Sequence, residues 1–185
     1  MTRSMTDLVW YVAYGSNLSQ ERFGYYLRGG QPPGAQRSYP GCRDQTPPRA
    51  VVGVRIPGRV RFGGVSLVWG GGLAYLDREA AGEVVARGYL IGVDQLDEVH
   101  GWERKYDARS TVGDRDGVPM VALTSTEQHE PAAPSAPYLR TILSGLTDGL
   151  LADEAAIAYV LDAEGVTPGW DADGVRSLIV GQAAE

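Results

Sequence analysis

The stretch WYVAYGSNLSQERF, residues 10–23, constrains the fold most, because an apolar run stops abruptly in a small polar turn. Gly15, Ser16 and Asn17 end a segment with the character of a buried strand, and a helical pattern begins directly afterwards. Asn17 and Gln20 have the spacing of a helix capping box, which favours a plain turn. Successive backbone N–H groups at such a turn can also bind an anion, so a pocket is the alternative.

Six segments rich in β-branched and aromatic residues lie between glycine and proline residues, and each is predicted to form a strand. The predicted strands are residues 8–13, 51–56, 60–69, 73–76, 84–91 and 118–125. Within the third segment, Gly63 and Gly64 predict a bulge or a tight bend.

Helical signals occur at residues 18–27, 94–106, 136–146, 153–163 and 171–180. The order of strand, helix, several strands, helix, strand and then helices favours an α+β fold over a regular βαβ alternation. A length of 185 residues predicts one domain spanning residues 1–185. Residues 29–49 contain five prolines and predict a long loop that serves as a rim or a lid.

The charge and cysteine content exclude several classes of function. A net charge of -6 gives no basic field for nucleic acid or an anionic membrane. A single cysteine, Cys42, excludes an internal disulfide, so we expect the protein to work in a reducing cytoplasm. The sequence contains no Cys/His cluster, so we predict no zinc site. The N-terminal apolar run is shorter than the roughly 7 to 15 residues of a signal-peptide core, so this run is not expected to be a signal peptide.

Several common active-site motifs are missing from the sequence. The glycine clusters lack the P-loop and dinucleotide patterns, so Gly70–Gly72 predicts a turn or a close backbone approach. No GxSxG pattern accompanies the two histidines, His100 and His129. Cys42 is more typical of a small buried residue than of a nucleophile.

One carboxylate is a better candidate for chemistry. Leu96, Val99 and Glu103 recur at helical spacing and fall on one side of the predicted helix. A charged glutamate on an apolar stripe is costly, so it either pairs with a cation such as Arg104, Lys105 or a distant arginine, or it has a raised pKa. The residues alone favour the ion pair.

Taken together, these residues resemble the γ-glutamylcyclotransferase family. Residues 14–18 have that family's Y-G-S-N-L motif intact, and Trp69–Ala74 is similar to its W-x-G-G-x-A strand. Residues 133–150 are similar to a third family segment, with Pro134, Ser135 and Tyr138 in register. The resemblance therefore extends over nearly the whole chain in the same order.

The resemblance implies an α+β fold built on a small mixed β-barrel with surrounding helices. It implies a cofactor-free and metal-independent enzyme that cleaves a γ-glutamyl amide by attack of the substrate's own α-amine, which releases 5-oxoproline and a free amine or amino acid. The expected partner is a small γ-glutamyl substrate, and a homodimer is left open. Alternatives are a binding module of the same fold that lost its acid/base group, and a γ-glutamyl amide hydrolase or amidotransferase.

The resemblance also implies the site residues. The substrate-binding residues would be Tyr14, Gly15, Ser16, Asn17, Leu18 and Tyr138. Direct alignment of LDEVHG puts His100 at the position of the family's acid/base glutamate, whereas the helical spacing favours Glu103 and leaves Glu98 as a second alternative. Arg104 replaces the glycine that usually follows that glutamate. We take Glu103 as the predicted catalytic residue.

Overall fold

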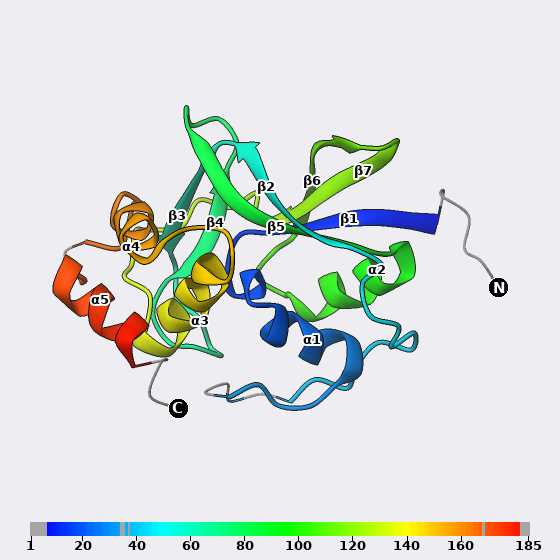
Figure 1. The fold of residues 1–185 in the computed structure, drawn as a ribbon, viewed down its shortest axis with the longest axis horizontal. Coiled ribbons are helices and arrows are strands. Elements are labelled where there is room, and N and C mark those ends of the chain that lie inside the picture. The colour runs from blue at the N-terminus through cyan, green and yellow to red at the C-terminus, as the bar shows by residue number, and fades with distance from the viewer. Residues whose placement is uncertain (1–6, 34–35, 37, 168, 182–185) are drawn as a thin grey trace.

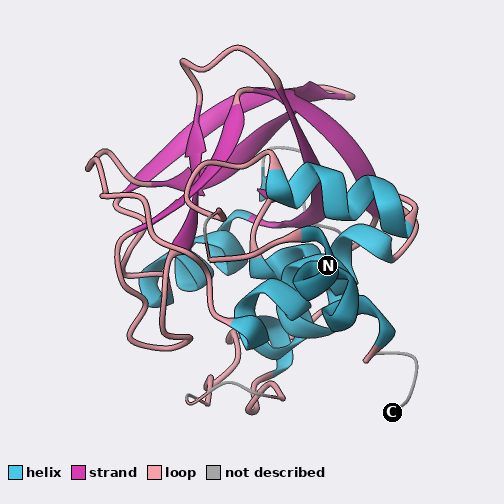
Figure 2. Cartoon of the chain, turned by 90° about the vertical axis from the view of Figure 1, so that its left-hand side faces the viewer, coloured by secondary structure: helices cyan, strands magenta, loops and turns pink. Residues whose placement is uncertain are grey.

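The structure is a computed structural model that describes residues 7–33, 36, 38–167 and 169–181. Its strands are β1 (Leu8–Ala13), β2 (Val51–Pro57), β3 (Arg59–Gly63), β4 (Leu73–Asp77), β5 (Glu83–Gly92), β6 (Ala108–Arg115) and β7 (Val118–Thr124). Its helices are the 3-10 helix η2 (Ser16–Leu18) and the α-helices α1 (Gln20–Arg28), α2 (Val93–Trp102), α3 (Ala136–Thr147), α4 (Asp153–Leu161) and α5 (Ala172–Val180). The predicted α+β class is confirmed, and Figure 2 shows the strands on one side of the molecule and most helices on the other.

The main sheet has the strand order β2-β5-β1-β7-β6, and β3 and β4 form a separate pair. In the main sheet, β1 lies antiparallel to β5 and parallel to β7. The sheet is open rather than closed into the expected barrel, with β2 and β6 as its two edges. Gly58 explains this difference in part, because its φ of 124° lets the chain leave β2 sharply, and β3 then pairs with β4.

Two strand predictions need correction. The segment 60–69 forms a strand only as far as Gly63, because Gly64 turns the chain with a φ of 64°. Strand β6 was not predicted, because its sequence ARSTVGDR is mostly polar and only Val112 is buried. Such a pattern is typical of an edge strand that faces solvent, and it lacks the apolar run used to recognise the other strands.

The five predicted helices are all present, with shifts of a few residues at their ends. The expected capping box of Asn17 and Gln20 is wrong, because the N-cap of α1 is Ser19, whose side chain accepts a hydrogen bond from the Arg22 amide at 3.2 Å. Asn17 instead lies within η2. Among the described residues, none of the helices has the length and apolar character needed to cross a membrane.

Strand β1 is buried along its whole length, and its alternate side chains belong to two different hydrophobic clusters. Leu8, Trp10 and Val12 belong to one hydrophobic cluster together with residues of α3, α4 and α5. The alternate residues of β1 belong to a second cluster with residues of α1 and α2. Figure 1 shows α3–α5 grouped at one end of the molecule and α1 and α2 beneath the sheet. The exit of β1 therefore opens between two helical groups.

The turn after β1 is held by a close backbone contact with α3. A Cβ atom at Gly145 would lie 2.3 Å from the carbonyl carbon of Leu18. By contrast, a Cβ at Gly101, in helix α2, would meet nothing within 4 Å. These two helical glycines thus form a matched pair for testing the contact.

We expect Gly145→Ala to lower the free energy of unfolding by ~1–3 kcal/mol, because either α3 or η2 must move to relieve the overlap. Gly101→Ala should raise it by about 0.5–1 kcal/mol, because alanine is the better helix former at a position with free space. Urea denaturation of both variants measures the difference. A Gly145→Ala protein as stable as the wild type would contradict the close contact.

Candidate active site

A cavity of about 170 Å³ opens beside the turn that follows β1. Its walls come from the turn itself, from α1, from the end of α2 and from α3. The loop of residues 29–49 contributes Tyr39, which agrees with the expectation that this loop forms a rim, although residues 34, 35 and 37 lie outside the described part of the chain. The polar and aromatic lining residues include Ser16, Arg22, Tyr26, Tyr39, Trp69, Trp102, Glu103 and Tyr138.

Glu103 lies in the wall of this cavity and is partly buried. The Tyr26 hydroxyl donates a hydrogen bond of 2.5 Å to its Oε1 atom. Burial raises the pKa of Glu103, and the bonds from Tyr26 and Asn17 and the positive charge of Arg22 oppose this shift only in part. A carboxyl group of this kind can gain or lose a proton nearer to neutral pH than an exposed glutamate can.

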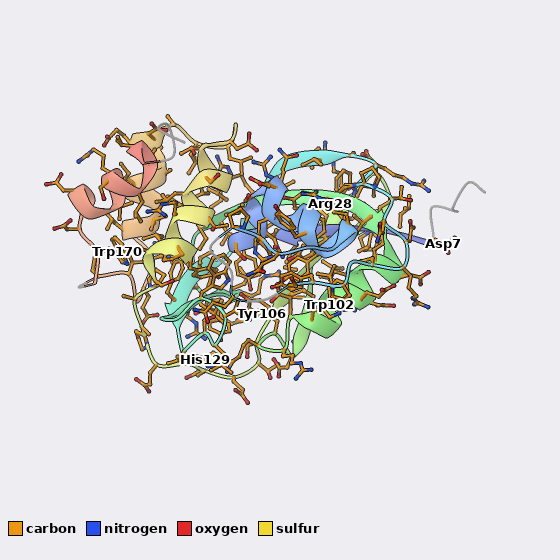
Figure 3. All side chains as sticks on the ribbon, turned by 90° about the horizontal axis from the view of Figure 1, so that it is seen from below. Asp7, Arg28, Trp102, Tyr106, His129 and Trp170 are labelled. Carbon is orange, nitrogen blue, oxygen red and sulfur yellow. The ribbon has the colours of Figure 1, made fainter. Side chains whose placement is uncertain are left out.

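Local backbone geometry explains why Glu103 faces the cavity. Helix α2 ends at Trp102, and Glu103 is its C-cap residue, with its amide bonded to the carbonyls of Val99 and His100. The Tyr106 amide then donates to the Glu103 carbonyl at 2.9 Å and closes a tight turn. Figure 3 labels Trp102 and Tyr106, which line the cavity on either side of Glu103 in the chain. The predicted stripe therefore exists, although Glu103 stands just past the helix end.

The two alternative positions for the acid/base group lie elsewhere. Glu98 forms an ion pair with Arg43, with a distance of 3.1 Å between Arg43 Nε and Glu98 Oε1. His100 Nδ1 accepts a hydrogen bond from Arg109, so its Nε2 donates to the Tyr106 carbonyl. Neither side chain is among the lining residues of the cavity. Of the three candidates, only Glu103 faces this space.

A second, smaller cavity of about 20 Å³ joins Glu103 to the turn of residues 14–17. The Tyr89 hydroxyl donates to the Asn17 carbonyl at 2.7 Å, and Asn17 Nδ2 donates to the Tyr11 hydroxyl at 3.0 Å. These bonds hold the turn rigidly on the sheet. The first amides of a helix have no partner within it, so the N–H groups of Ser16 and Asn17 are the donors that this turn can offer.

The other predicted site residues, Tyr14, Leu18 and Tyr138, differ in whether they line a cavity. Tyr14 borders the smaller cavity, and its hydroxyl donates to the Leu123 carbonyl at 2.5 Å. Leu18 lines neither of these two cavities: its side chain is fully buried in the core, and its amide donates to the Gly15 carbonyl. Tyr138 lines the larger cavity and also packs in the core, with its hydroxyl accepting from the Ala74 amide.

Sequence reasoning missed the aromatic and cationic part of the site. Arg22 and Tyr26 are four residues apart on α1, where the sequence pattern predicts a helix without indicating a site. Their spacing places both on one face, which was the available signal. Tyr39, Trp69 and Trp102 come from segments far apart in the sequence, and no local pattern connects them.

The described residues contain no group of three or more His, Cys, Asp and Glu side chains placed to hold a metal ion. Cys42 is buried away from the cavity, and burial together with the carboxylates of Glu98 and Asp44 raises the pKa of its thiol to about 11. A thiol with this pKa is a poor nucleophile near neutral pH. The polar groups that line the cavity include the carboxyl group of Glu103, the hydroxyls of Tyr26, Tyr39 and Tyr138, and the cationic groups of Arg22, Arg104 and Lys105.

Comparison with known structures places this arrangement in a known fold. A structure described as a γ-glutamyl cyclotransferase superposes with a TM-score of 0.60 at 22% identity, covering 95% of this chain and 99% of the other. An uncharacterized protein from Homo sapiens gives a TM-score of 0.58 at 23% identity, covering 83% of this chain and 86% of the other. YkqA from Bacillus subtilis gives a TM-score of 0.54 at 18% identity, covering 81% of this chain and 52% of the other.

The chain has the γ-glutamylcyclotransferase fold. At identities of 18–23%, the likeness establishes the fold alone.

Sequence comparison adds little about function. No protein-family model matches the chain. Histone deacetylase 5 of Arabidopsis thaliana is 42% identical over 69 residues, which is 36% of this chain. That match spans only 10% of the deacetylase's own length.

The raised pKa of Glu103 makes a prediction about stability. Between the usual carboxyl pKa of about 4.3 and the raised value, the folded protein binds more protons than the unfolded chain does. The contribution of this group to stability is therefore complete at low pH and is lost as the pH rises through that interval. Glu103→Gln cannot ionise, so its free energy of unfolding should increase relative to the wild type as the pH rises.

Urea denaturation at several pH values from about 4 to about 8 measures this difference. Glu98→Gln is the matched control, because it removes a carboxyl group that lies outside the cavity and is paired with Arg43. It should show no such gain. Parallel pH curves for Glu103→Gln and the wild type would contradict the effect of burial on Glu103.

Proposed function

We propose that the protein is a γ-glutamylcyclotransferase-type enzyme, with Glu103 as its acid/base residue. The observation that supports this most is the shared cavity of Glu103 and the turn of residues 14–17. Glu103, whose pKa is raised by burial, lines this cavity together with Ser16 and Asn17, the first residues of η2. The γ-glutamylcyclotransferase fold supports the same proposal without fixing the substrate.

The reaction needs a single proton shuttle. The substrate's α-ammonium group gives a proton to the Glu103 carboxylate, and the free α-amine attacks the γ-carbonyl carbon. The new C–N bond closes the five-membered ring of 5-oxoproline, and the original amide C–N bond breaks. Glu103 then returns this proton to the departing amine, so one carboxyl group acts first as a general base and then as a general acid. The second proton that the attacking nitrogen loses, as it becomes the ring amide, passes to the departing amine as well, so the products are 5-oxoproline and a protonated amine.

The turn would supply the electrostatic part of catalysis. Its N–H groups would bind the α-carboxylate or stabilise the oxyanion that develops on the γ-carbonyl, and one donor of the second kind is typically worth ~3–4 kcal/mol of barrier. The rigid attachment of the turn through Tyr89 and Tyr11 keeps these donors in place. Holding the substrate folded for ring closure adds an entropic advantage.

The proposal is tested with a panel of γ-glutamyl amides, with 5-oxoproline detected by mass spectrometry. We expect the wild type to form 5-oxoproline and Glu103→Gln to lose at least about 100-fold in kcat/KM, because proton transfer is removed. Glu98→Gln, on the same side of the sheet but bound to Arg43, should retain activity.

The product and the variants separate the alternatives. Glutamate in place of 5-oxoproline would indicate a hydrolase that uses an external nucleophile. No turnover of any amide would favour a binding module and refute the proposed enzyme. Full activity of Glu103→Gln would leave an enzyme but refute the assignment of Glu103.

A further prediction concerns the hydrogen bond from Tyr26 to Glu103. This bond favours the ionised carboxylate, so Tyr26→Phe should raise the pKa of Glu103 further. The acidic limb of the pH profile of kcat/KM should therefore move to higher pH by about one to two units, since a hydrogen bond to a charged group is worth ~1.5–3 kcal/mol. An unchanged limb with a lower plateau would mean that Tyr26 acts on the substrate rather than on Glu103.

A further inference from the structure

Arg22, on the cavity-facing side of α1, is a buried cation, and some of its N–H groups have no hydrogen-bond partner among the described residues. Its side chain is only 4% exposed. Nη2 donates to the Tyr39 hydroxyl at 2.7 Å, whereas Nε and Nη1 have no hydrogen-bond partner among the described residues. Buried guanidinium donors without partners are costly, so their retention in this wall calls for a physical explanation.

Aromatic rings hold the guanidinium at the cavity wall. Its central carbon lies 5.0 Å from the ring centre of Tyr26, 4.8 Å from that of Tyr39 and 5.4 Å from that of Trp69. All three rings line the 170 Å³ cavity, as Arg22 itself does. These cation–π contacts compensate for part of the lost hydration but leave the N–H groups unpaired.

Arg87, the second buried arginine in the described part of the chain, shows what a structural arginine does in this protein. Its side chain is 5% exposed, and its Nε and Nη2 atoms donate to the carbonyls of Leu18, Gly145 and Asp148. Arg22 makes no hydrogen bond of this kind to a described backbone carbonyl. The contrast indicates a partner for Arg22 that is not part of the chain.

The charge of the cavity indicates what that partner is. Arg22, Arg104 and Lys105 line the cavity, and Glu103 is the one acidic residue among its described lining residues. A hydrogen bond to the Glu103 carboxylate comes from the Tyr26 hydroxyl, whereas Nε and Nη1 of Arg22 have no partner among the described residues. An anion of small size therefore fits the space beside Arg22, and a planar guanidinium is well suited to a carboxylate.

We propose that Arg22 is a specificity-determining residue that binds a carboxylate of the substrate through its unpaired N–H groups. Building on the proposed function, this carboxylate belongs either to the γ-glutamyl group or to an amino acid attached to it. Arg104 and Lys105, which are exposed at the cavity, assist by attracting the anion.

A binding experiment tests this without any turnover. Glutarate, a dicarboxylate, and glutaramide, its uncharged analogue, are titrated against the protein while the fluorescence of Trp69 and Trp102 in the cavity wall is followed. The wild type should bind glutarate more tightly than glutaramide, and Arg22→Gln should lose that preference by at least about 10-fold. Equal binding of the two ligands to the wild type, or an undiminished preference in Arg22→Gln, would overturn the proposal.

Arg28→Gln is the matched control, because Arg28 lies on the same helix, stacks over Tyr25 and is not among the residues that line the cavity. It should keep the wild-type preference, and thermal unfolding checks that each variant folds. If Arg22→Gln does not fold, Arg22→Lys serves instead, because it keeps the charge and removes the guanidinium. It should weaken glutarate binding several-fold and leave glutaramide unaffected, and no change would overturn the proposal.

Kinetics then identify the source of the carboxylate. γ-Glutamylalanine carries a carboxylate on its leaving group, and γ-glutamylethylamine does not. An equal loss of kcat/KM for both in Arg22→Gln assigns the γ-glutamyl α-carboxylate, and a loss for γ-glutamylalanine alone assigns the leaving-group carboxylate. Wild-type kinetics on both would overturn the proposal. Failure of the wild type to turn over either amide would instead refute the proposed function, and the glutarate titration would still decide the role of Arg22.

Discussion

The buried guanidinium of Arg87, on β5, fixes the place where the sheet meets the helices. It donates to the carbonyl of Leu18 at the end of η2 at 2.8 Å, and to the carbonyls of Gly145 and Asp148 at the end of α3 at 2.9 and 2.7 Å. The last carbonyls of a helix have no hydrogen-bond partner within it, and they carry its partial negative charge. A guanidinium there donates hydrogen bonds to these carbonyls and also neutralises that charge. The position of the turn after β1 is thus set by a side chain from the neighbouring strand.

Against this fixed base, the cavity is built mainly from rings that carry polar groups. Burial raises the pKa of the Tyr26 hydroxyl well above its usual value, and the nearby Glu103 carboxylate adds to the shift. Tyr26 therefore remains a hydrogen-bond donor at any pH at which the protein works. The rings of Tyr26, Tyr39 and Trp69 at the same time shield Arg22 from water. The aromatic wall thus supplies both a donor for the carboxyl group and a binding surface for the cation.

The sequence predicted the local features of this site much better than the long-range ones. Strand β1, the helices and the stripe of Leu96, Val99 and Glu103 follow from periodicity, which depends on neighbours in the chain. The open edges of the sheet and the bond between Tyr26 and Glu103, 77 residues apart, depend on tertiary packing that no local pattern encodes. The cap at Ser19 was missed because the unpredicted helix η2 displaced the start of α1 beyond Asn17.

The surroundings of Glu103 combine opposing influences on its ionisation. Burial favours the neutral acid, and so does its position at the C-terminal end of α2, where the helix carbonyls present partial negative charge. Hydrogen bonds from Tyr26 and Asn17 and the positive charge of Arg22 favour the carboxylate. Some surroundings of Glu103 therefore favour its neutral form, and others favour its ionised form. A group that must accept a proton from an ammonium ion and then return it to a leaving amine requires this balance, because a carboxyl fixed in either state could perform only one of the two steps.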